Sequence, residues 1–247
     1  MLEKIIVEKW FTANAVFGIF PANSIGDDIE IYTNDDRKGL LCTLHFLRQQ
    51  TRTPPGVPNY CLADYIAPEE SGIKDYMGAF AVACGFGMEA KLEEFESQHD
   101  DYNAILLKAI ADRLAEAFAE RLHQRVRQDF WGYAKDENLD NNALIGEKYK
   151  GIRPAPGYPA CPEHSEKETL WNLLDVTENT GITLTDSWAM VPTAAVSGWY
   201  FSHPDSRYFG IGKINQDQVK DYAKRKGQEF HKVERLLSPA LGYDPDE

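Results

Sequence analysis

The sequence lacks several features that would assign a class of protein at once. It has only four cysteines, Cys42, Cys61, Cys84 and Cys161, and no two of them form a Cys-x-x-Cys pair. This spacing favours neither a zinc ribbon nor a redox dithiol and is typical of reduced cytoplasmic thiols. No stretch approaches about 18 continuous apolar residues, and the charged N-terminus is unlike a signal sequence. We therefore expect a cytoplasmic protein that does not bind a membrane.

Positive charge is also scarce in this chain. Lysine and arginine contribute 26 residues against 39 aspartates and glutamates, which gives a net charge of −13. A field of this sign repels polyphosphates, so we expect no binding of nucleic acid, whereas a small cationic ligand is favoured. Because 43% of the 247 residues are hydrophobic, the chain is long and apolar enough for a proper core.

The apolar pattern predicts a mixture of strands and helices. Strand-like patterns occur at 16–20, 29–32, 39–47, 78–84, 182–190, 194–201 and 208–214, with turn formers at 21–28 and a loop at 52–58. Helical patterns occur at 88–131 with a break at 100–103, and at 142–149, 165–176, 216–226 and 229–237. Without regular βαβ alternation, this order predicts one α+β domain over residues 1–247, a twisted, largely antiparallel sheet flanked by long helices.

Two motifs suggest cofactor or metal chemistry that their context does not support. Gly85-Phe-Gly87-Met-Glu-Ala90 has a dinucleotide-binding pattern, but an acidic helix and then another helix follow it, so no βαβ unit closes. Glu-x-x-His pairs occur at 96–99 and 120–123, about 20 residues or roughly 30 Å of helix apart, so they cannot share a metal. We interpret the two pairs as solvated helix-face residues that pair with Arg113, Arg121 and Arg127.

The segment 151–164 is the strongest candidate for a binding site. Its four prolines, at positions 154, 156, 159 and 162, hold the backbone extended and leave polar backbone groups free to face a ligand. Arg153 offers a planar fork for a carboxylate, Gly157 permits close approach, and Tyr158 supplies an aromatic face. The alternative is a stiff surface connector.

Several long motifs in a fixed order resemble one known family. They include 20–23 with 26–32, 47–50, 59–64, 98–103, 111–120, 151–164 and 197–206. From about Phe17 to Tyr243 the chain resembles the C-terminal activation domain of cobalamin-dependent methionine synthase.

The resemblance implies a function in cofactor repair. The family's domain binds S-adenosylmethionine and covers the cobalamin when that cofactor has been oxidised to its inactive cob(II) state. A flavodoxin-like donor or a flavoprotein reductase supplies an electron, and S-adenosylmethionine supplies the methyl group. The cobalamin belongs to another domain of the same methyltransferase, and the metal performs the transfer. We therefore expect no catalytic side chain and no metal site in this chain.

The resemblance also implies which residues contact the nucleoside ligand. The family's Arg-x-x-x-Gly-Tyr signature and a later tyrosine carry over onto Arg153, Ala155 through its backbone, Gly157, Tyr158, Tyr208 and the adjacent Phe209. The sulfonium of such a ligand tolerates nearby carboxylates, for which Glu116 and Glu147 are candidates.

The chain departs from the family at its N-terminus. Relatives carry an upstream segment, with an aromatic motif and an aspartate that holds the ligand's amino group, and we expect this chain to be N-terminally truncated relative to them. We therefore expect a fragment of a longer enzyme that does not turn over alone.

The alternative function is a non-catalytic docking module for the electron donor and the cobalamin domain. Its candidate contact is the basic group of Lys213, Lys220 and residues 224–226, although a solvated helix end is the favoured interpretation.

Overall fold

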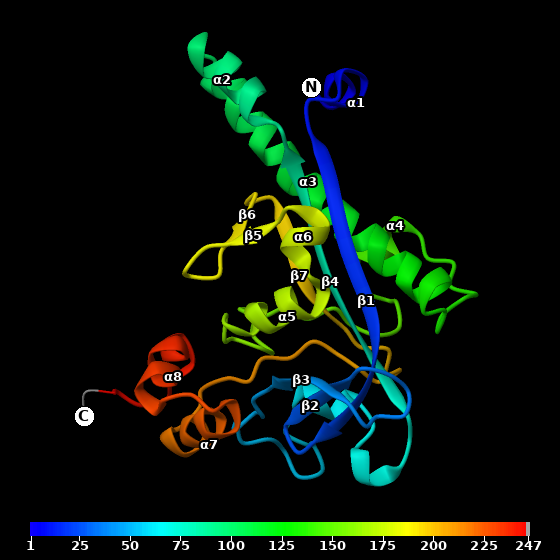
Figure 1. The fold of residues 1–247 in the computed structure, drawn as a ribbon, viewed down its shortest axis with the longest axis vertical. Coiled ribbons are helices and arrows are strands. Elements are labelled where there is room, and N and C mark those ends of the chain that lie inside the picture. Colours follow the sequence, from blue (N-terminus) through cyan, green and yellow to red (C-terminus); the bar gives the residue numbers. More distant parts are fainter. Residues whose placement is uncertain (246–247) are drawn as a thin grey trace.

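A five-stranded antiparallel sheet forms the centre of the molecule, in a computed structural model that describes residues 1–245 (Figure 1). The strand order is β3-β2-β1-β4-β7. The strands are β1 (Thr12–Ile25), β2 (Asp28–Tyr32), β3 (Leu40–His45), β4 (Asp75–Phe86) and β7 (Ala195–Tyr200), with a separate pair β5 (Thr183–Leu184) and β6 (Met190–Val191). The helices are α1 (Leu2–Glu8), α2 (Glu89–Ser97), α3 (Asp101–Arg125), α4 (Asn141–Ile145), α5 (Glu166–Leu174), α6 (Val176–Thr180), α7 (Gln216–Lys226) and α8 (Phe230–Leu236). The predicted α+β class with a largely antiparallel sheet is confirmed.

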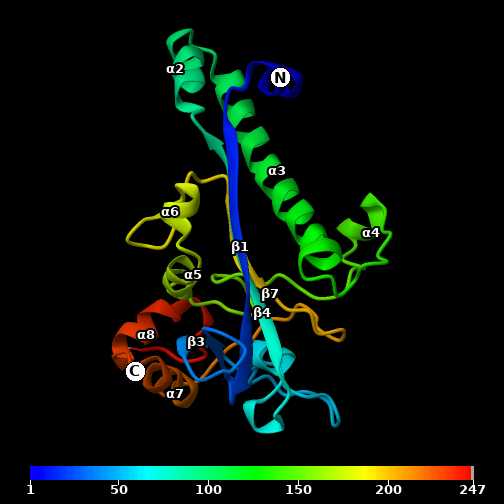
Figure 2. The ribbon, with the colours of Figure 1, turned by 45° about the vertical axis from the view of Figure 1, so that its right-hand side comes forward.

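Strand β4 lies between two neighbours and two layers of helix. It pairs with β1 from Thr12–Phe86 to Ala22–Asp75 and with β7 on its other side. Phe80 and Val82 pack toward α3, whereas Ala81 and its odd-numbered neighbours pack toward α5. Figure 2 shows α3 on one side of the β1–β4 ladder and α5 and α6 on the other. Because both faces are covered, β4 has no polar alternation, which confirms the predicted buried strand.

Helix α3 begins where the sequence predicts a break. The Asp100 carboxylate accepts a hydrogen bond from the Asn103 backbone N–H at 3.1 Å and so caps the first turn of the helix. Along the sheet, Ala111, Ala115 and Ala119 are almost fully buried, and their small side chains let the helix approach the strands closely. Five residues of π-helix (Val126–Phe130) continue the helix.

The strand predictions are wrong at three places. Strand β1 continues through Pro21 to Ile25, so the turn to β2 is much shorter than the predicted 21–28. A proline is tolerated there because pairing with β2 begins only at the next residue. The segment predicted as one strand at 182–190 reverses direction and forms the β5–β6 pair. Residues 208–214 form no strand, because their apolar side chains fill two clusters while the backbone has no continuous partner.

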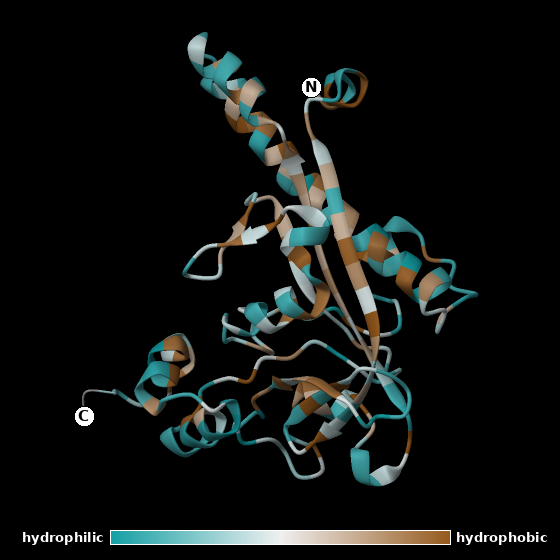
Figure 3. Cartoon of the chain, in the orientation of Figure 1, coloured by the Kyte–Doolittle hydropathy of each residue, from teal (hydrophilic) through white to brown (hydrophobic). Residues whose placement is uncertain are grey.

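The C-terminal helices form a second apolar cluster beside the sheet. Helix α7 is mostly hydrophilic in Figure 3 and buries Val219, Tyr222 and Ala223, which lie on one side of the helix. These residues pack with Ile211, with Ile214 and with residues of α8. No helix within residues 1–245 is both long enough and apolar enough to cross a membrane.

Candidate functional site

The proline-rich ribbon, residues 151–164, lies against the outer edge of β7. Ile152 and Phe201 exchange two backbone hydrogen bonds of 3.0 Å, and the Trp199 N–H donates to the Pro154 carbonyl at 2.9 Å. A Cβ atom at Gly198 would lie 2.5 Å from that carbonyl oxygen, so the close approach requires glycine there. The ribbon is therefore fixed to the sheet.

The middle of the ribbon turns sharply at Gly157. Its N–H donates to the Cys161 carbonyl at 2.7 Å, and its φ of +94° lies in the region that favours glycine. A Cβ atom at this position would lie 2.2 Å from Cε1 of His164. Glycine thus permits both the turn and the packing of the His164 ring beneath it.

The ribbon forms one wall of a cavity of about 680 Å³. The other walls come from α3, α5, the start of β7 and residues 208–210. Five of the six residues predicted to contact a ligand line this cavity: Arg153, Ala155, Tyr158, Tyr208 and Phe209. Gly157 does not line it but joins two residues that do. The two candidate carboxylates, Glu116 and Glu147, also line the cavity. The predicted residues therefore surround one space, although 55 positions separate Arg153 from Tyr208.

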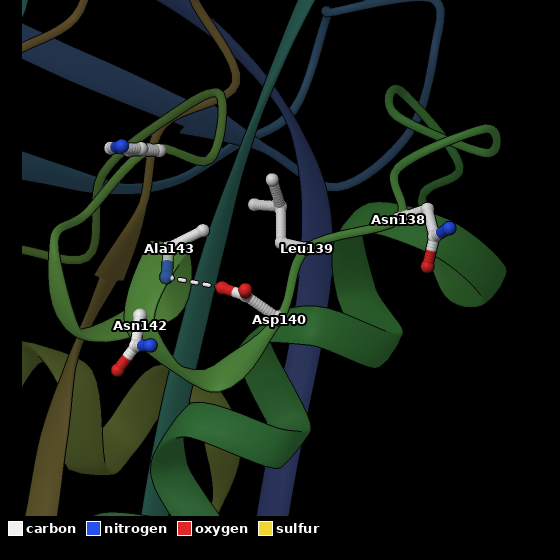
Figure 4. A pocket seen from close by; sticks show the side chains of 6 residues that line it. Asn138, Leu139, Asp140, Asn142 and Ala143 are labelled. Atoms are coloured by element: carbon white, nitrogen blue, oxygen red, sulfur yellow. Dashed lines mark hydrogen bonds between the residues drawn. The ribbon is translucent and has the colours of Figure 1, made fainter.

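Another hollow, of about 500 Å³, lies beside α4 and contains no predicted site residue (Figure 4). It is lined by Asn138, Leu139, Asp140, Asn142, Ala143 and Lys148. The Asp140 carboxylate accepts the Ala143 N–H at 2.8 Å and thereby caps α4, so its role here is structural.

Arg153 is held from two directions. Its Nη2 atom lies 2.9 Å from Oε2 of Glu120, and its backbone N–H donates to the Tyr208 hydroxyl at 3.0 Å. Burial lowers the pKa of the guanidinium, but Glu120 and neighbouring tyrosines outweigh that effect and raise it, so Arg153 stays charged. Its Nη1 atom is buried and has no hydrogen-bond partner among the described residues. A buried donor of this kind is expensive unless a ligand satisfies it.

Behind Arg153 lies His123, which is fully buried. Its ring stacks on Tyr200 at a centroid distance of 5.0 Å and meets Tyr149 edge-on. Burial, together with the charges of Arg127 and Arg153, holds the pKa of His123 well below its usual value, so the ring is neutral near pH 7.

The interpretation of Glu120 and His123 as solvated helix-face residues is therefore wrong. Glu120 pairs with Arg153, a residue of the ribbon, and not with an arginine of its own helix. The spacing of Glu116, Glu120, His123 and Arg127 at steps of three and four residues was the available signal, because it places these polar side chains in one stripe along the helix, exposed at Glu116 and fully buried at His123 and Arg127. Glu96 and His99 are exposed, as expected. Within residues 1–245, no group of three or more histidine, cysteine, aspartate or glutamate side chains could hold a metal ion.

The cavity is also lined by a histidine–lysine pair that the sequence did not predict. The Lys167 Nζ atom lies 3.0 Å from Nδ1 of His164 and donates to the Trp188 carbonyl at 3.1 Å. Burial lowers the pKa of both side chains. The two residues are only three positions apart, at the end of the ribbon and the start of α5, but the sequence pattern did not single out this pair.

The favoured interpretation of residues 224–226 as a solvated helix end is wrong for two of the three residues. Arg225 forms ion pairs with Asp28 and Asp221, and Lys226 forms ion pairs with Glu163 and Glu166. The Lys226 side chain is 8% exposed. Arg225 and Lys226 are therefore paired with carboxylates of the same chain and do not contribute to a basic docking patch.

The fold and the cavity define a small-molecule-binding domain in which a proline-rich ribbon closes a site at the edge of an antiparallel sheet. The chain belongs to the family described as the vitamin B12 dependent methionine synthase activation domain, whose model matches residues 1–227. It is also similar to a chain in the crystal structure of the MetH reactivation domain bound to AdoHcy. The two are 59% identical with a TM-score of 0.96, and the match covers 99% of this chain and 75% of that one. The predicted family is confirmed.

Proposed function

We propose that the chain binds S-adenosylmethionine in the cavity between the ribbon and α3, and presents its methyl group for the reductive methylation of cob(II)alamin. The observation that carries the proposal is the buried Nη1 atom of Arg153, which has no partner among the described residues and belongs to a side chain lining the cavity. The similar reactivation domain was crystallised with AdoHcy, which is S-adenosylmethionine without the transferable methyl group.

The donors and surfaces of the cavity fit such a ligand. The guanidinium of Arg153 suits the amino-acid carboxylate, because a charge-assisted bond to Nη1 would satisfy that buried donor. Tyr158 is 64% exposed and offers an aromatic face to the adenine, opposite Tyr208 and Phe209. The Ala155 carbonyl accepts the Tyr158 N–H at 3.2 Å, so the Ala155 N–H is the backbone group offered to a base edge. Glu116 and Glu147 supply negative charge for the sulfonium.

These residues bind and orient the methyl donor and need not transfer a proton. Cobalamin, held by another domain of the enzyme, supplies the acceptor for the methyl group. The work of this chain is therefore to hold the donor at a fixed position, which lowers the entropic cost of transfer. The electron donor is a flavodoxin-like protein or a flavoprotein reductase, and the enzyme acts in the cytoplasm as part of a methionine-forming methyltransferase.

The test is calorimetric titration with S-adenosylmethionine. We expect Arg153→Ala to weaken binding by about 1.5–3 kcal/mol, or roughly 10- to 150-fold, the range for a charge-assisted hydrogen bond. Arg121→Ala is the matched control, because Arg121 is an exposed arginine of α3 that contacts Gln124. Equal affinities of the Arg153 variant and the unmodified chain would remove Arg153 from the site, and no binding by the unmodified chain would contradict the proposed function.

A further inference from the structure

We infer that Glu120 is a positioning residue for the ligand site: it holds one arm of the Arg153 guanidinium and so fixes the direction of a side chain that lines the cavity. The inference rests on the proposed function and assigns a role to a residue outside the predicted contact set. Glu120 does not line the cavity itself, whereas Glu116, one turn earlier on α3, does.

The ion pair between Glu120 and Arg153 is one-sided. Oε2 of Glu120 and Nη2 of Arg153 are 2.9 Å apart, but Oε1 and Nη1 are both buried without hydrogen-bond partners among the described residues. A carboxylate and a guanidinium that served only to stabilise each other would gain from a bidentate contact. The pair instead leaves one guanidinium nitrogen free in a side chain that lines the cavity.

The structure holds Glu120 firmly enough to act as a fixed support. It follows Ala119 on α3 and lies one turn before His123; both of these residues are fully buried, whereas the Glu120 side chain is 26% exposed. The contacts between α3 and β4 tie the helix to the centre of the sheet. The Glu120 carboxylate therefore belongs to a helix packed on the sheet, and it can serve as a fixed support for the Arg153 side chain of the ribbon.

Within residues 1–245, Glu120 is the carboxylate that forms an ion pair with Arg153. Arg127, the next arginine along the stripe, makes a two-nitrogen contact with Glu137, and both side chains are almost fully buried. His123 is held neutral by its surroundings. The hydrogen bond from the Arg153 backbone to Tyr208 fixes the main chain but leaves the side-chain torsions free. Glu120 is thus the carboxylate that sets the direction of the Arg153 side chain.

The opposite role is also physically possible, since a carboxylate beside Arg153 could compete with the ligand's carboxylate and weaken binding. The two roles predict different results. Support through geometry requires only an acceptor at the position of Oε2, which glutamine retains and alanine removes. Competition through charge predicts that both substitutions tighten binding.

The test measures dissociation constants for S-adenosylmethionine and for 5′-methylthioadenosine, which lacks the amino-acid carboxylate. We expect Glu120→Ala to weaken S-adenosylmethionine binding about 10-fold and to leave methylthioadenosine binding within about 2-fold. We expect Glu120→Gln to return S-adenosylmethionine binding to within about 3-fold of the unmodified chain. The double variant Glu120→Ala/Arg153→Ala should bind no more weakly than Arg153→Ala alone, because Glu120 acts through Arg153. Glu93→Ala, an exposed glutamate of α2, is the control.

Three results would overturn the inference while leaving the proposed function intact. They are unchanged or tighter S-adenosylmethionine binding in the alanine variant, an equal loss for both ligands, and a glutamine variant as weak as the alanine variant. If Glu120→Ala does not fold, the same two dissociation constants are measured for Glu120→Gln. S-adenosylmethionine binding that weakens far more than about 3-fold in this variant would then contradict the inference. Failure of the unmodified chain to bind S-adenosylmethionine would instead contradict the proposed function.

Discussion

At the scale of single residues, two buried arginines lie near one histidine that carries no charge. Arg127 is paired with Glu137 and Arg153 with Glu120, and His123 lies in the field of both arginines. A protonated His123 would add a third positive charge to this buried group. The neutral imidazole instead stacks on Tyr200.

The low pKa of His123 predicts an acid-sensitive stability. In the unfolded chain this histidine titrates near its ordinary value of 6.5, whereas in the folded chain its pKa is well below that. Below about pH 6.5 the unfolded state therefore binds more protons, and the free energy of unfolding should fall by up to about 1.4 kcal/mol per pH unit until the folded pKa is reached.

Urea unfolding of the unmodified chain and of His123→Phe, at pH 7.5 and 5.5, measures this contribution. Phenylalanine keeps a buried ring against Tyr200 but cannot take a proton, so the variant should lose less stability on acidification. The same loss in both proteins would show that other groups account for it.

The sequence could predict candidate ligand-binding residues in the ribbon but not the residues that hold them in place. Arg153, Gly157 and Tyr158 lie within six positions of one another, where the prolines restrict the backbone and reveal the segment. Glu120 comes from a helix more than 30 positions earlier, and its partner depends on how α3 crosses the sheet. Charge and spacing within one helix cannot report such a contact, so Glu120 was assigned to solvent.

At the scale of elements, patterns with a local cause were predicted well. The start of α3 follows from a capping aspartate, and β4 follows from a continuous apolar run between glycine-rich ends. The segment 208–214 has similar apolar residues, yet its N–H groups bond singly to distant segments, as when Ile211 donates to the Pro159 carbonyl. A strand needs a continuous hydrogen-bonded partner strand, and 208–214 has none. Such a partner is remote in sequence, so the local pattern cannot show whether it is present.

The N-terminal cap of α3 should make a measurable contribution to stability. Asp100→Ala removes the acceptor for the Asn103 N–H and should lower the free energy of unfolding, because the first turn of α3 loses its side-chain cap. Chemical denaturation at neutral pH provides the measurement, with Asp112→Ala, an exposed aspartate within the same helix, as the control. A change in the control equal to that in Asp100→Ala would mean that helix propensity or net charge, and not capping, sets the effect.

At the scale of the whole molecule, a buried ionic network joins helix α7 to the proline-rich ribbon. Lys226 of α7 contacts Glu163 at the end of the ribbon and Glu166 at the start of α5, and also donates to the Ser165 hydroxyl at 2.8 Å. Burial favours the neutral form of Glu163, but Lys226 outweighs it and lowers the pKa of that carboxyl. The ribbon is therefore anchored to the sheet at one end and to α7 at the other.

Lys226→Met should destabilise the whole chain. The substitution keeps the length of the side chain but leaves two buried carboxylates without their cation, which costs about 3–5 kcal/mol in comparable buried pairs. Lys224→Met, at an exposed position of the same helix, should change stability by less than about 0.5 kcal/mol. Thermal or urea unfolding of the three proteins separates the two effects, and similar stabilities of both variants would show that the network contributes little.

The contact between the ribbon and β7 also bears on how copies of this chain behave when crowded together. An uncovered outer strand offers its backbone to any passing strand and so promotes aggregation and domain swapping. Here the polar backbone of residues 199–201 is already bonded to residues 152–154, and the prolines that follow have no N–H to extend the pairing outward. The ribbon that lines the proposed ligand cavity thus also covers this edge of the sheet, and a mutation that detached it would expose a template for self-association together with the cavity.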